Sequence, residues 1–91
     1  MAVTVVLPSV LARFAGGQRT HASPAGTIEE VLARVAQPYP ELGKRLADAT
    51  RDGNEFVTVY LNDEDTRFSG GFETYAADGD EVTIVSAIAG G

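Results

Sequence analysis

Hydrophobic positions recur along the chain in two rhythms, and each rhythm predicts a different kind of element. Residues 2–7 are mostly β-branched and nearly all apolar, which is typical of a central strand. In residues 56–61 and 81–87 alternate side chains are apolar, and the last stretch places Val82 and Ile84 on one face. These three stretches predict the main strands of a sheet with at least one covered face.

Two weaker stretches predict further strands. Residues 18–23 are polar and follow the turn-forming pair Gly16 and Gly17, so we expect a strand at the edge of the sheet. Residues 62–65 predict a polar turn, and residues 66–68 a short strand after it. The sheet is therefore expected to contain four to five strands.

A helical rhythm begins at Thr27. Thr27 and Glu30 have the spacing of a capping box, in which each residue's side chain bonds the other's backbone N–H. The apolar residues that follow lie three and four positions apart and form one stripe: Ile28, Val31, Leu32 and Val35. Pro38 ends this helix, and residues 41–49 predict a short second one.

The order of these elements favours an α+β fold with one main helix packed across a mixed sheet. The β-grasp (ubiquitin-like) arrangement has this order and length. Because the first and last strands are the most apolar, we expect both in the interior of the sheet. Residues 1–87 are assigned to this domain and residues 88–91 to a flexible C-terminal tail.

Composition narrows the classes of function. Thirteen acidic and seven basic residues give a net charge of −6, which disfavours nucleic acid and anionic membrane surfaces and favours a basic protein partner. No apolar run approaches the roughly 20 residues of a membrane span, so we expect a cytoplasmic protein. Cysteine is absent, which excludes disulfides, thiolate metal sites and a thiol nucleophile, and no metal site is predicted.

The pair Gly90 and Gly91 is the feature that chemistry could use. Without Cβ atoms these residues can lie extended in a narrow channel and leave a terminal carboxylate sterically open. Counted from residue 87 at about 3.3 Å per residue, the tail reaches roughly 15 Å, enough to enter a partner's active site. Ile88 and Ala89 would thread the same channel. A tail without any function is the plainer alternative.

The second half of the chain resembles the ubiquitin-like sulfur carriers of the MoaD and ThiS family. The similarity is carried by residues 61–71, 77–80, 82–84 and 87–91, and the N-terminal residues 3–5 and 16–18 fit it as well. Within that family the sequence around Arg67, Phe68 and Gly71 is most similar to the actinobacterial carriers that supply sulfur for cysteine synthesis.

The resemblance implies a protein substrate rather than an enzyme. An E1-like adenylating enzyme of the MoeB and ThiF type would use ATP to activate the Gly91 carboxylate, and a sulfur donor would convert it to a thiocarboxylate. That sulfur would pass to an acceptor such as a PLP-dependent cysteine synthase, and a metalloprotease would release the product. The chain itself would bind no cofactor.

Three aromatic residues, Phe68, Phe72 and Tyr75, lie between glycines in a segment whose periodicity does not force them inside. The resemblance implies an exposed apolar patch for docking on the adenylating enzyme, and packing in the core is the alternative. His21 lacks a neighbouring acid and receives no role, and residues 63–65 are interpreted as a solvated turn rather than a cation site.

Two alternative functions use the same tail. A small subunit of molybdopterin synthase would insert it into a large catalytic subunit, and a ubiquitin-like modifier would join it to lysines of other proteins. Lys44 is the single lysine of this chain, which offers a chain-building modifier few acceptor amines.

Overall fold

The computed structural model describes residues 2–49, 57–68 and 70–86, which form a five-stranded mixed sheet with helices packed on it. In spatial order the strands are β2 (Thr20–Ser23), β1 (Val3–Val6), β7 (Glu81–Ser86), β4 (Val57–Leu61) and β5 (Glu64–Asp65). β1 and β7 run parallel, while β2 pairs antiparallel with β1 and β4 antiparallel with β7. The two most apolar strands occupy the interior and the polar β2 an edge, as predicted.

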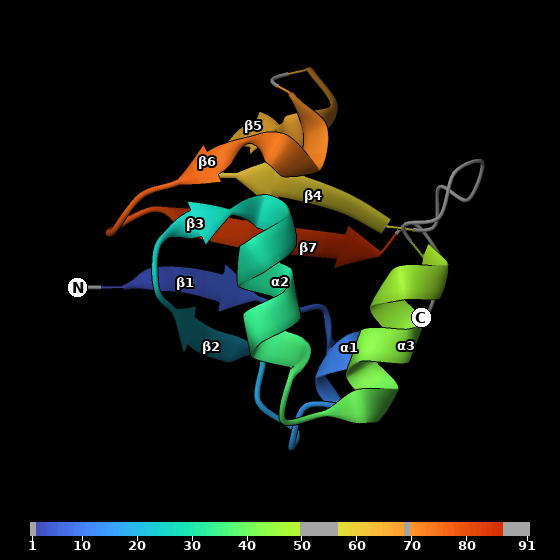
Figure 1. Ribbon diagram of the computed structural model, residues 1–91. Helices are drawn as coiled ribbons and strands as arrows, with labels where there is room; N and C mark the ends of the chain where they lie inside the picture. The colour runs from blue at the N-terminus through green and yellow to red at the C-terminus, as the bar shows by residue number, and fades with distance from the viewer. Residues whose placement is uncertain (1, 50–56, 69, 87–91) are drawn as a thin grey trace.

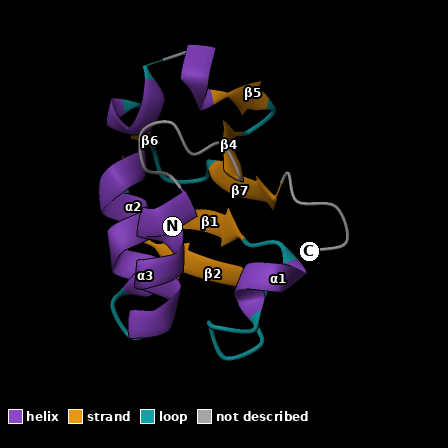
Figure 2. Ribbon diagram, turned by 90° about the vertical axis from the view of Figure 1, so that its right-hand side faces the viewer, coloured by secondary structure: helices purple, strands orange, loops and turns teal. Residues whose placement is uncertain are grey.

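The main helix, α2 (Ile28–Ala36), begins with the predicted capping box. The Glu30 backbone N–H donates to Thr27 Oγ1 at 3.2 Å, and the Thr27 N–H donates to Glu30 Oε1 at 2.9 Å. The apolar stripe of α2 is buried against the sheet, which the helix crosses on one face (Figure 1). Viewed from the side, α2 and α3 lie on the same side of the strands (Figure 2).

Two further α-helices, α3 and α1, also contribute to the core. The predicted second helix is α3 (Pro40–Ala49), which buries Leu42 and Leu46. The sequence pattern did not indicate α1 (Ser9–Ala12), which follows β1 after Leu7 and Pro8 and buries Leu11 and Ala12. A helix this short carries too few positions for a helical period to be visible.

The prediction of a strand over residues 66–68 was wrong. This segment is a 3₁₀ helix, η1 (Thr66–Phe68), and the short strand β5 lies just before it, within the predicted turn. Thr66 is 1% exposed and its Oγ1 donates to the Val59 carbonyl at 2.9 Å, while Asp65 Oδ1 accepts from the Arg67 N–H. These side-chain bonds to backbone compete with a strand ladder and favour a turn of helix.

A second sheet joins distant parts of the chain. β3 (Gly26–Thr27), at the start of α2, pairs antiparallel with β6 (Tyr75–Ala76), which follows the 3₁₀ helix η2 (Gly71–Glu73). The Ile28 N–H also donates to the Thr74 carbonyl, so the start of α2 is tied to the segment before β7.

The core lies between α2, α3 and the covered face of the sheet. Its fully buried larger side chains come from both layers and include Val3, Val5, Leu7, Ile28, Val31, Leu42, Val82 and Ile84. This strand order with one helix across the sheet is the β-grasp arrangement expected from the sequence. Among the described residues no helix is both long and apolar enough to span a membrane.

Candidate functional site

The strand that leads to the predicted tail is held on both sides. β7 pairs with β1 through residues 81–83 and with β4 through residues 82–86, so that Ser86, the last residue of β7, lies opposite Val57. Val82 and Ile84 anchor it to the core. Gly91, Gly90, Ala89 and Ile88 lie outside the described residues. The structure therefore describes β7, the strand that precedes the tail, up to Ser86.

The aromatic residues predicted to dock a partner occupy different surroundings. Tyr75, on β6, is 62% exposed and is the most exposed large hydrophobic side chain of the described residues. Phe72, on η2, is half-buried and packs against the core. The side chain of Phe68 lies outside the described part. Docking through these residues stays a prediction.

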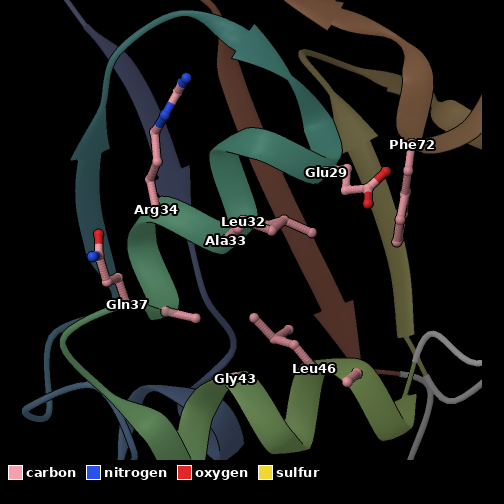
Figure 3. Close-up of a pocket in the computed structure, with 10 residues that line it drawn as sticks. Glu29, Leu32, Ala33, Arg34, Gln37, Gly43, Leu46 and Phe72 are labelled. Atoms are coloured by element: carbon pink, nitrogen blue, oxygen red, sulfur yellow. The ribbon is translucent and has the colours of Figure 1, made fainter.

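Phe72 lines a groove of about 770 Å³ between α2, α3 and η2 (Figure 3). Leu32 and Leu46 face each other across it from the two helices, and Glu29 stands beside Phe72 at one end. Small residues of α3, Gly43 and Ala47, help to keep the groove open. The groove is mainly apolar and carries no cluster of reactive side chains.

In the acidic segment 63–65, the side chain of Asp65 is hydrogen-bonded to Arg67. Asp65 accepts hydrogen bonds from the Arg67 guanidinium at 2.8 to 3.3 Å, and these bonds together with that from the Arg67 backbone lower the pKa of Asp65. Asp63 and Glu64 are exposed, as a solvated turn requires. Within residues 2–49, 57–68 and 70–86 no three acidic, histidine or cysteine side chains come together as a metal-binding group.

His21 has a structural role in its edge strand. Its Nε2 is 2.8 Å from the Gln18 carbonyl, and its ring meets the edge of Tyr39 with centroids 5.9 Å apart. Tyr39 also lies against Gly16, whose φ of +70° suits the left-handed turn at that position. The histidine therefore helps to hold β2 to the connection between α2 and α3.

Sequence reasoning missed one charged cluster. Arg13 and Arg45 both lie over the ring of Phe14, with their Cζ atoms 5.6 and 4.6 Å from its centroid. Arg45 comes from α3 and Phe14 from the turn after α1, so only tertiary packing brings them together. The adjacency of Arg13 to an aromatic residue was the one local signal available.

Comparison with known proteins gives consistent results along the whole chain. The model of the ThiS family matches residues 5–91. The sulfur carrier protein CysO of Mycobacterium tuberculosis is 43% identical over 93 residues, which cover 100% of both chains.

Solved structures show the same β-grasp fold. A chain in the crystal structure of the Amycolatopsis orientalis BexX/CysO complex superposes with a TM-score of 0.85 at 38% identity, covering 99% of this chain and 100% of that one. The crystal structure of Mycobacterium tuberculosis CysO gives a TM-score of 0.82 at 41% identity, covering 94% of this chain and 99% of that one.

Proposed function

The chain belongs to the ThiS family, and from this membership we propose that it is a sulfur carrier whose working group is the carboxylate of Gly91. The observation that carries the proposal is a match to a sulfur carrier over the full length of both chains. The firmly paired strand β7, from which the tail continues, supports it.

The chemistry follows from the low reactivity of a carboxylate. A carboxylate oxygen of Gly91 attacks the α-phosphorus of ATP on an adenylating partner, and pyrophosphate leaves. Hydrosulfide then attacks the acyl carbon and loses its proton, and AMP leaves with the electrons of the carbon–oxygen bond. The product is a thiocarboxylate, in which the nucleophilic atom is sulfur.

The partners supply the catalysis in this scheme. The chain contributes a docking surface and an end that fits a narrow channel, and it acts as substrate rather than enzyme. A relative has been solved in the BexX/CysO complex, which supports assembly with a partner protein. We propose an adenylating enzyme of the ThiF type as the loading partner, a PLP-dependent cysteine synthase as the acceptor, and the cytoplasm, where ATP is available, as the place of reaction.

Intact mass spectrometry tests the loading step. After incubation with ATP, sulfide and a ThiF-type enzyme encoded in the same genome, we expect a gain of about 16 Da as oxygen is replaced by sulfur. Because the chain has no cysteine, a thiol-alkylating reagent should then label the loaded end selectively. A variant lacking Gly90 and Gly91 is the matched control and should show neither change.

The proposal fails if no candidate enzyme produces the mass gain in the full chain. Masses corresponding to conjugates with lysines of other proteins would instead indicate a modifier. Co-purification with a pterin-binding subunit would indicate the small subunit of molybdopterin synthase.

A further inference from the structure

The cluster of Arg13, Phe14 and Arg45, here called the arginine cluster, leaves hydrogen-bond donors available. Phe14 packs against the core, which fixes the ring on which the guanidinium groups lie. Arg45 Nε donates to Glu41 Oε2 at 2.9 Å, and its Nη groups make no bond to a described residue. The Arg13 guanidinium has no hydrogen bond or ion pair with any residue of the described ranges.

A guanidinium group that lies over an aromatic ring keeps its N–H groups free at the edge of its plane. Those N–H groups form the planar fork that binds a carboxylate with two parallel hydrogen bonds. Contact with Phe14 also restricts the side chains before binding, which lowers the entropy lost when a partner is bound. The arginine cluster is thus suited to a carboxylate partner.

The cluster lies at the end of the sheet from which the tail leaves. β1 and β7 are parallel, so α1, which follows β1, lies near the end of β7 at Ser86 (Figure 1). Arg19 is at this end too, because its backbone carbonyl accepts from the Leu7 N–H and its Nε donates to the Leu7 carbonyl. Arg13, Arg45 and Arg19 therefore all lie toward the end of the sheet at which β7 ends.

Acidic residues gather at the opposite end of the same strands. Glu81 is the first residue of β7 and comes just after Asp78 and Asp80. Asp63 and Glu64 come just after the end of β4. They lie near Glu81, because the neighbouring residue Asn62 is hydrogen-bonded to the backbone of Glu81. Acidic side chains therefore predominate at this end, where Arg67 is paired with Asp65, and Glu41 is the acidic partner of Arg45 in the arginine cluster. An uneven distribution of charge orients a carrier as it approaches a charged partner.

We propose that the arginine cluster is the tail-side docking surface for acidic side chains at the channel entrance of the adenylating enzyme. This inference rests on the proposed function and names the chemistry of the partner's surface. Carboxylates at that entrance attract the basic end and repel the acidic end. The partner therefore receives the end of the sheet that carries the tail.

The test compares two charge reversals of equal size. Arg13→Glu removes the unpaired cation of the cluster. Lys44→Glu is the matched control on α3, because Lys44 is exposed and is not one of the two cations that lie over the Phe14 ring. Steady-state adenylation by the ThiF-type enzyme is measured for both variants and the wild type at low and high salt. Circular dichroism confirms that both variants are folded.

We expect Arg13→Glu to raise the KM for the carrier about tenfold at low salt, with kcat unchanged, and Lys44→Glu to change it less than about threefold. The difference should shrink at high salt, and Arg13→Lys should retain part of the affinity. Equal KM values for the two reversals would overturn the inference alone. No adenylation of the wild type would overturn the proposed function, and the inference with it.

Discussion

The two faces of the sheet differ sharply although they are made by the same strands. On the face covered by α2 and α3, Val82 is 0% exposed and Ile84 2%. On the other face their neighbour Val85 is 43% exposed, and Thr83 is half-buried. One step along β7 therefore separates a residue that holds the fold together from one that faces outward. The contrast teaches that stability and surface chemistry can be changed separately in this protein.

The largest expected effect comes from the same substitution made on each face. Val82→Ala removes two buried methyl groups and should cost about 2–3 kcal/mol of unfolding free energy. Val85→Ala, three positions along β7, should cost less than about 0.5 kcal/mol because its side chain is already largely in water. Urea denaturation of both variants measures the difference, and equal losses would contradict the separation of the faces.

The buried hydroxyl of Thr66 allows a second comparison between a buried and a more exposed side chain. Thr66→Val keeps the shape of the side chain but removes the donor to the Val59 carbonyl, so that a buried acceptor loses its partner. We expect a loss of about 1–2 kcal/mol in urea denaturation. Thr58→Val, on the partly exposed face of β4, is the control, and a similar loss there would show that the hydroxyl bond of Thr66 is unimportant.

Substitutions at Thr27, the N-cap of α2, measure how much the capping hydrogen bond stabilises the fold. Thr27→Ala removes the oxygen that accepts from the Glu30 N–H and should cost about 1 kcal/mol. For a chain of this size that corresponds to a fall in Tm of roughly 4–8 °C. Thr27→Ser keeps the acceptor and should retain most of the stability. Equal Tm values for the two variants would exclude a capping contribution.

The smallest expected effect is a dependence of the folding stability on pH, through Glu30. The hydrogen bond from the Thr27 backbone N–H, helped by the charge of Arg34, lowers the pKa of Glu30 below its ordinary value of 4.5. Ionised Glu30 therefore contributes stability that is present above that value and is lost as the pH falls through the lowered pKa. Thermal unfolding of wild type and Glu30→Gln from pH 7 to pH 3 should give Tm values that converge in acid. A constant difference would rule out this linkage.

The strands and α2 could be predicted because their side chains repeat with a fixed period and the capping box has a fixed spacing. The 3₁₀ helices η1 and η2 could not be predicted, since they depend on single features such as the bond from Thr66 to Val59 and the φ of +114° at Gly70. Neither feature leaves a periodic trace in the sequence.

Only some residues of the candidate site leave a signal in the sequence. The prediction for Gly90 and Gly91 came from residue type and position alone, and both lie outside the described residues. Tyr75 was correctly suspected of lying outside the core, and it is exposed. The pairing of Arg13 with Arg45 required the packing of α3 beside Phe14, which no local pattern encodes.

The position of β7 between β1 and β4 has a mechanical consequence. A force applied along β7 from beyond Ser86 loads the hydrogen bonds to β4 at residues 84–86 first, and then the bonds to both β4 and β1 at residues 82–83, in shear. A strand at the edge, such as β2, has a single ladder to share such a load. Pairing on both sides of residues 82 and 83 therefore helps the folded body to resist unravelling from this end.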